Sequence, residues 1–465
     1  MHIDLTYRYL THHIVPGPQS LSYFVPLLIL PIALCIPRHI LSKWQSIAIF
    51  MPIVAYAMID AWRCMRGIDV ISTNQVLWCL YFLVLRDPWE DFSLITPARS
   101  LKENDKAGQI GHNSYANGST STDHEDKNNT TTRVQTYPPT LIQRIPWVLR
   151  LLSSIRLNSW LINLPSHDTH QPPTPAFRSR KAFLAQAALS FTRGYLILDL
   201  TSAYTSLDPY FTNPKISIHD PLLLSPRIAS RLGVAWPYTV PLRALVVGAQ
   251  AWALISQLFY LPAIFPVLLN GLGILPDEWS PHTWAAYYGP ASTIFDYGVR
   301  GFWGRYWHQT MRHSCSAPGY ALADAVGLSR GGAGLGRWGV VSGVAFGLSG
   351  VVHAGLVSPE PLHSTIGVNK IRLLIAGFFW LQPIALLAEA VVSRLVRATG
   401  LLWPRTRWIK RVVNAVWVLG WFVLCLPLLA EAGRQLGFWR YRTVPFSLWR
   451  YVRGQDPVIW PFLKG

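Results

Sequence analysis

The chain of 465 residues is 51% hydrophobic and only 14% charged, with a mean hydropathy of +0.24. Soluble domains carry about 25% charged residues, so this composition indicates a multi-pass membrane protein and argues against a soluble globular enzyme. The formal net charge is +18, but the basic residues lie in short loops between apolar runs. That arrangement is typical of topology signals and anionic lipid contacts, so we expect membrane lipid and no nucleic acid as a partner.

The N-terminal part of the chain, residues 1–95, is expected to supply transmembrane helices. Its three apolar runs are Leu21–Ile36, Trp44–Ile59 and Val70–Leu85. The first residues lack the short charged lead of a cleavable signal peptide, so the first run is expected to serve as its own targeting signal. The five cysteines show no paired spacing, and we expect no disulfide framework, no metal site and no bound cofactor.

Residues 96–140 have a different composition, dominated by polar and charged side chains. The run NGSTSTDHEDKNNTTT begins at Asn117, and such a segment cannot bury enough apolar surface to fold. We therefore expect a disordered polar loop. It carries glycosylation sequons at Asn117, Asn128 and Asn129, which matter only if the loop is lumenal, and the membrane orientation stays open.

Residues 141–465 are expected to form the main helical bundle. Residues 141–164 place three arginines among Leu, Ile and Trp, a pattern typical of a helix that lies in the membrane interface. Membrane-length apolar runs follow at 182–204, 241–269, 338–357, 371–392 and 412–430. The predicted fold class is therefore all-α, a polytopic bundle of about eight transmembrane helices with one disordered polar loop.

The apolar run Trp338–Val357, WGVVSGVAFGLSGVVHAGLV, carries a single ionisable side chain, His353. An ionisable residue inside a membrane helix is expensive and suggests a functional site. Helical spacing places Ser349 and His353 on one stripe, and small residues such as Gly343, Gly347 and Gly350 on the neighbouring stripe, where another helix can approach closely. The alternative from this run alone is a buried histidine bonded to a nearby carbonyl.

A second distinctive stretch, residues 300–313, reads RGFWGRYWHQTMRH. If it is helical, Arg305, His308 and Arg312 share one face, and Trp303 and Trp307 share another. Such a helix suits a membrane interface, with aromatic anchors and a cationic face toward an anionic group. The alternative is a plain interfacial anchor helix.

The pairing of FWGRYWHQ with the downstream SGVVHAG resembles the wax synthase-like group of membrane-bound O-acyltransferases. Members carry an FWGRxWH or FWGRxWN box, followed about forty residues later by an intramembrane histidine after Ser-Gly. In this sequence the box consists of Phe302, Trp303, Gly304, Arg305, Trp307 and His308, and the later histidine is His353. The order and spacing of the two motifs are more specific than either motif alone.

This resemblance implies an acyl-CoA co-substrate, a hydroxyl acceptor and a catalytic histidine in a tunnel through the helices. Neutral imidazole titrates near working pH and can remove the alcohol proton, so His353 is the expected base. The resemblance assigns to His308 the orientation of that base or a bond to the thioester oxygen. Arg305 and Arg312 are candidates for CoA phosphates, and Trp303, Trp307 and Ser349 complete the substrate-binding candidates.

Several functions stay open at this point. The resemblance favours acetyl transfer from acetyl-CoA to a lipophilic alcohol, such as a terpenoid or meroterpenoid of fungal secondary metabolism, in the endoplasmic reticulum membrane. Long-chain wax ester synthesis is the alternative within the group. A transporter with His353 as proton relay is the alternative from another class, but the chain shows no matching halves. A thiolate route through Cys315 and a nucleophile elbow at residues 327–331 are disfavoured, because no strand context or cysteine–histidine pairing supports them.

Overall fold

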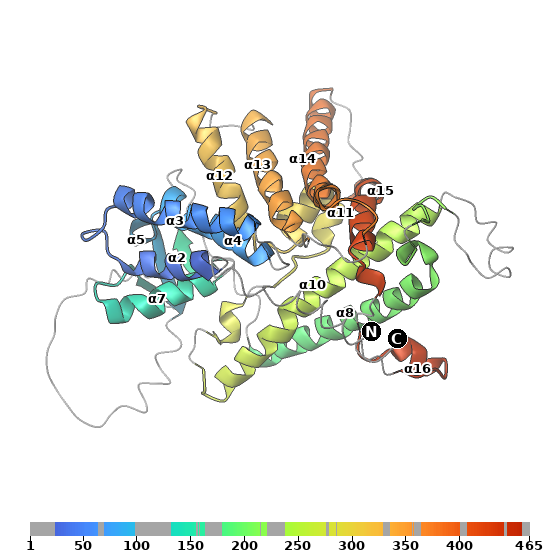
Figure 1. Ribbon diagram of the computed structural model, residues 1–465, viewed down its shortest axis with the longest axis horizontal. Helices are drawn as coiled ribbons and strands as arrows, with labels where there is room; N and C mark the ends of the chain where they lie inside the picture. Colours follow the sequence, from blue (N-terminus) through green and yellow to red (C-terminus); the bar gives the residue numbers. More distant parts are fainter. Residues whose placement is uncertain are drawn as a thin grey trace.

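The computed structural model describes the parts of the chain that carry its helices and a small sheet (Figure 1). The described residues are 24–63, 69–97, 132–154, 157, 159–162, 179–213, 215–220, 238–275, 279–284, 286–328, 335–355, 357, 364–399, 407–440 and 444–457. Most of the expected polar loop, including its three sequons, falls at 98–131 and lies outside the described residues.

The N-terminal elements gather at one end of the molecule, drawn in blue to teal in Figure 1. They are α2 (Val25–Cys35), α3 (Lys43–Arg63), α4 (Asp69–Cys79), the π-helix η2 (Leu80–Leu85), α5 (Pro88–Asp91), β1 (Phe92–Pro97), β2 (Thr132–Gln135), α7 (Leu141–Ser153) and β3 (Trp160–Ile162). An aromatic core that includes Phe82, Phe92, Trp147 and Trp160 joins them. Trp147 and Trp160 meet edge to face, with ring centroids 4.8 Å apart.

The all-α prediction is confirmed for the helical bulk of the chain but omitted a three-stranded antiparallel sheet. Its strand order is β2-β1-β3, with Leu94 opposite Gln135 on one side and Trp160 on the other. The two ends of the polar segment are thus paired with each other. Strands this short carry little alternation, and their pairing is long-range, so the sequence pattern did not reveal them.

The interfacial helix expected at 141–164 is shorter, and Arg144, one of its two arginines, points inward. Arg144 is buried and donates from Nε to the Pro138 carbonyl (2.9 Å) and from Nη1 to the Cys35 carbonyl (3.4 Å). The exposed side of α7 is apolar instead, and Ile142 is 85% exposed. The guanidinium is therefore a structural link to the end of α2.

The central and C-terminal helices form the rest of the bundle. They are α8 (Arg180–Leu207), α10 (Thr239–Gly271), α11 (Ser292–Gly301), the π-helix η8 (Phe302–Tyr306), α12 (Arg312–Ala325), α13 (Leu335–Ala354), α14 (Val368–Ala398), α15 (Arg407–Gln435) and α16 (Leu448–Val452), with 3-10 turns η4 (Pro209–Phe211), η7 (Pro281–Thr283) and η9 (Phe438–Arg440). Helices α8 and α10 run side by side, and α13 lies between α12 and α14 (Figure 1).

Four of the described helices are long and apolar enough to cross a membrane: Thr239–Gly271, Leu335–Ala354, Val368–Val396 and Arg407–Gln435. These coincide with four of the eight predicted spans and make the chain an integral membrane protein. The full count of eight is not confirmed. Helix α2, for example, has 11 residues and rises only about 16 Å, well short of a hydrocarbon core of about 30 Å.

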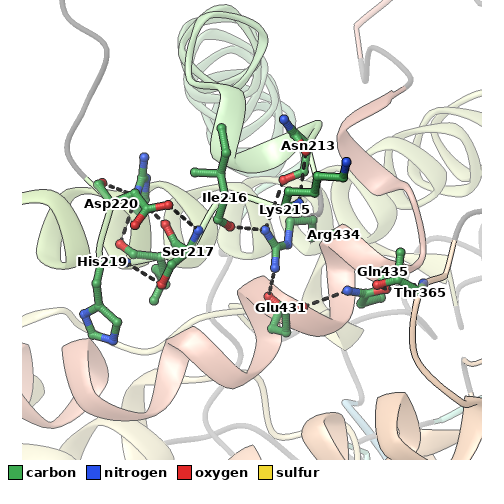
Figure 2. A network of polar contacts seen from close by, with 12 residues as sticks. Asn213, Lys215, Ile216, Ser217, His219, Asp220, Thr365, Glu431, Arg434 and Gln435 are labelled. Carbon is green, nitrogen blue, oxygen red and sulfur yellow. Dashed lines mark hydrogen bonds and ion pairs between the residues drawn. The ribbon is translucent and has the colours of Figure 1, made fainter.

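A buried ion pair holds the connection between α8 and α10. Arg243 is 0% exposed, and its Nε and Nη2 donate to the two carboxylate oxygens of Asp208, both at 2.8 Å. The remaining Nη1 donates to three carbonyls of the loop at 217–220. On the other side of this loop, Arg434 of α15 binds the carbonyls of Asn213 and Ile216 and the carboxylate of Glu431 (Figure 2). Two arginines thus tie the loop to α10 and α15.

We expect Asp208→Asn to lower the free energy of unfolding by about 3–5 kcal/mol, because it leaves the buried Arg243 guanidinium without a counter-charge. Thermal unfolding of the detergent-solubilised protein measures this loss. Asp220→Asn is the matched control, since its carboxylate lies in the same loop, is exposed and, among the described residues, accepts only a backbone N–H from Ser217. Equal shifts for the two variants would contradict the assignment.

Candidate active site

A cavity of about 3050 Å³ opens among the helices that carry both sequence motifs. It is larger than a typical small-molecule pocket of roughly 300–1,000 Å³, so it has room for two substrates. Its walls are mainly aliphatic and aromatic, and none of the described residues that line it is an Asp or a Glu. Six of the seven predicted site residues line it: Trp303, Trp307, His308, Arg312, Ser349 and His353. Arg305 does not.

His353 is in the last turn of α13, at the wall of the cavity. Its Nδ1 lies 2.7 Å from the carbonyl oxygen of Ser349. A carbonyl only accepts, so a neutral imidazole must carry its proton on Nδ1, which leaves the lone pair on Nε2. Among the described residues, Nε2 has no hydrogen-bond partner. The carbonyl bond of the alternative interpretation is therefore present, and it fixes the orientation of the ring with Nε2 free of protein hydrogen bonds among the described residues.

The ring of His353 is held from the side by α14. It stacks on Phe379, with centroids 4.1 Å apart and planes at 29°. Close approach of the two helices depends on Gly350, where an added Cβ would meet the Trp380 indole at 2.6 Å and the Ala376 carbonyl at 3.0 Å. The predicted glycine stripe is only partly used, because an added Cβ at Gly343 or Gly347 would meet nothing within 4 Å.

The FWGRYWHQ box does not form a regular helix. It runs as π-helix η8 from Phe302 to Tyr306, and at Trp307 the backbone turns to an extended conformation with φ −62° and ψ 152°. The prediction that Arg305, His308 and Arg312 share one helical face is therefore wrong. Gln309 stabilises the break, since its Nε2 donates to the carbonyls of Trp303 (2.9 Å) and Trp307 (2.6 Å).

His308 follows this break and lines the same cavity as His353. Its Nδ1 lies 2.8 Å from the Thr310 hydroxyl, which can donate or accept, so this contact does not select a tautomer. The ring stacks on Tyr287 at 5.5 Å. The structure thus brings the two predicted catalytic histidines to one cavity, each with its ring packed on an aromatic neighbour.

The two predicted anion-binding arginines have different surroundings. Arg305 is exposed, and its guanidinium lies 4.0 Å from the ring centroid of Tyr297, away from the cavity lining. Arg312 lines the cavity, as do three arginines that the sequence analysis missed: Arg150, Arg180 and Arg300. With no acidic residue among the described lining, these cations favour an anionic ligand.

Gln382, which was not predicted as a site residue, is fully buried in α14. Its Oε1 accepts hydrogen bonds from the indoles of Trp303 and Trp421, both at 3.0 Å. Trp303 in turn packs on Phe346 and Phe379, with centroids 5.4 and 6.4 Å away, so it shares Phe379 with the His353 ring. The sequence did contain a signal for it, a glutamine within an apolar run, because polar residues in membrane segments are rare unless they have a role.

Comparison with known proteins supports the family resemblance. Residues 284–366, which contain both the box and His353, match the membrane bound O-acyl transferase family. The chain is 28% identical over 293 residues to acetyltransferase eriL of Hericium erinaceus and 28% identical over 289 residues to acetyltransferase ple2 of Rhodocybe pseudopiperita. Each of these matches covers 62% of this chain and 66% of the relative.

A third relative is O-Mevalon transferase yanI of Aspergillus niger, 28% identical over 298 residues, a match that covers 60% of each chain. No solved structure matches the chain. The likeness to fungal acetyltransferases therefore rests on sequence, and it covers just under two thirds of the relatives' length.

We expect Gln382→Leu to destabilise the protein, because the half-buried indole N–H groups of Trp303 and Trp421 lose their acceptor, at a cost of about 1–3 kcal/mol each. Trp421→Phe is the control, since it removes one donor and leaves the bond between Trp303 and Gln382 in place. Thermal unfolding in detergent compares the two. A Gln382→Leu variant as stable as wild type would show that the indoles find other acceptors.

Cys315 lines the cavity but is expected to be unreactive. It is 4% exposed, and burial raises the pKa of its thiol to about 12, so the thiol stays protonated near neutral pH. Any acyl-transfer activity should therefore survive Cys315→Ser within about twofold, since thiol and hydroxyl are close in size and neither acts as nucleophile. Loss of activity in a folded Cys315→Ser protein would restore the thiolate route.

Proposed function

We propose that this chain, a relative of the membrane bound O-acyl transferases, transfers an acyl group from acyl-CoA to a hydroxyl of a lipophilic small molecule. Acetyl is the preferred group, supported by similarity to two fungal proteins named acetyltransferases. The large, mainly aliphatic and aromatic cavity suits a bulky terpenoid or meroterpenoid alcohol. The endoplasmic reticulum is the proposed membrane.

The observation that carries this proposal is the state of the His353 ring. Its Nδ1 proton is held by the Ser349 carbonyl, so the basic lone pair is on Nε2, in a residue that lines the cavity. A general base needs a free lone pair and a fixed orientation, and the His353 imidazole has both.

The reaction follows from this arrangement. His353 Nε2 takes the proton of the acceptor hydroxyl as its oxygen attacks the thioester carbonyl carbon. The C–S bond of the tetrahedral intermediate then breaks, the ester leaves, and the CoA thiolate recovers the proton from the imidazolium as a thiol. A thioester is already activated, so the step needs neither a metal nor a covalent enzyme intermediate. Apolar walls limit competing water.

The other residues of the cavity receive supporting roles. We assign to His308 the orientation of the base or a hydrogen bond to the developing oxyanion, and the second role needs a ring N–H. Arg312 and Arg300 are proposed for the CoA phosphates, while Arg305 is withdrawn from that role because it lies outside the cavity lining. Trp303, Trp307 and Ser349 form part of the wall against which the substrates pack.

We expect His353→Ala to lower acyl transfer by roughly 10²–10⁴-fold, the usual contribution of a general base. Microsomes that contain the protein are supplied with labelled acetyl-CoA or palmitoyl-CoA and a panel of terpenoid and long-chain alcohols, and the esters are extracted and counted. Transfer of palmitoyl but not acetyl groups would identify a wax ester synthase instead.

Ser349→Ala is the matched control, because it keeps the backbone carbonyl that orients the ring and removes only a hydroxyl 3.5 Å from Nδ1. It should lose far less activity than His353→Ala, because it removes one hydroxyl of the cavity wall and leaves the base in place. Normal turnover by folded His353→Ala would overturn the mechanism, and solute flux in vesicles without any ester would favour a transporter.

A further inference from the structure

A glycine kink shortly before the FWGRYWHQ box splits α11 into two helical pieces. Gly298 has φ 69° and ψ −145°, a conformation that residues with a Cβ rarely adopt. The second piece starts at Val299 and continues into η8, so its first backbone N–H groups lack partners in the preceding turn. Inside a membrane protein such groups need an acceptor from elsewhere.

Glu389 of α14 supplies that acceptor. Its Oε1 accepts from the Val299 N–H at 2.6 Å, and its Oε2 accepts from the Arg300 N–H at 2.9 Å. The Trp417 indole of α15 donates to the same Oε1 at 2.7 Å. One carboxylate thus receives three N–H donors from two other helices. Charge-assisted bonds of this kind are about twice as strong as neutral ones, and a carboxylate also complements the positive end of a helix dipole.

The kink and the carboxylate fit each other sterically. A Cβ added at Gly298 would lie 2.3 Å from Glu389 Oε1, so only a glycine allows the carboxylate to reach the two N–H groups behind it. None of the ion pairs among the described residues involves Glu389, so its close contacts are these three N–H donors.

Glu389 does not line the cavity, but several residues of the helical piece that it caps do. That piece carries Trp303, which shares Phe379 with His353, and it ends at the break that places His308. We infer that Glu389 is a positioning residue, which caps the box helix from α14 and sets where Trp303 and His308 stand relative to His353. The catalytic consequence rests on the acyl transfer proposed above, whereas the cap itself does not.

The first test is Glu389→Gln, which keeps an acceptor for Val299 and Trp417 but turns an amide N–H₂ toward the Arg300 N–H. We expect kcat for acetyl transfer, per folded molecule, to fall by about 10–100-fold, as for a displacement near 1 Å. Gly298→Ala should reproduce this loss, and the double variant should be no worse than the single ones, because both break the same contact.

Asp296→Asn is the matched control. This carboxylate also joins α11 to α15, through Arg411 at 2.8 Å, and that hydrogen bond lowers its pKa, but it does not touch residues 299 and 300. A merely structural carboxylate would lower the yield of folded protein and leave kcat alone, as expected for Asp296→Asn. An unchanged kcat in folded Glu389→Gln and Gly298→Ala proteins would overturn the inference.

A second measurement does not depend on enzymatic activity. His308→Cys is labelled in membranes with a maleimide, in the otherwise wild-type chain and together with Glu389→Gln or Asp296→Asn. We expect the labelling rate at residue 308 to change several-fold with Glu389→Gln and to stay the same with Asp296→Asn. Equal rates in all three proteins would refute the cap, whereas a change in rate without any ester formation would refute only the proposed reaction.

Discussion

No water is available inside a bilayer to accept a hydrogen bond, so every N–H that leaves a regular helix needs an acceptor within the protein. The candidate site lies where the chain leaves regular helix three times within ten residues: at the kink of Gly298, in the π-helix and at Trp307. Glu389 binds the N–H groups after the kink, and Gln309 binds carbonyls at the break. These polar contacts stabilise an irregular, cavity-lining segment.

The same helix, α14, serves both motifs. Through Phe379 it packs on the His353 ring, through Gln382 it holds Trp303, and through Glu389 it binds the backbone that precedes the box. Residues 382 and 389 are seven apart, so they lie on one face of the helix. The two stretches that carry the family resemblance are about forty residues apart in sequence, and α14 contacts both.

The site could be predicted from sequence where chemistry and motif coincide. His353 stood out because an imidazole in an apolar run is costly, and His308 stood out within the box. Both line the cavity. The same reasoning did not hold for Arg305, because its assignment assumed a continuous helix. The break at Trp307 makes the Arg305 and Arg312 side chains point in different directions. Helical periodicity predicts a shared face only while the helix continues.

Composition and periodicity by themselves determined that the chain is a helical membrane protein, because apolar length and low charge leave few other structures for its backbone. They also singled out His353 and the FWGRYWHQ box, and the family resemblance predicted His353 as the base. Tertiary structure alone decided the tautomer of His353, the sheet at the ends of the polar segment, and the roles of Gln382, Glu389 and Arg144. Each of these depends on a partner far away in sequence, or on a backbone carbonyl whose direction only the folded chain defines.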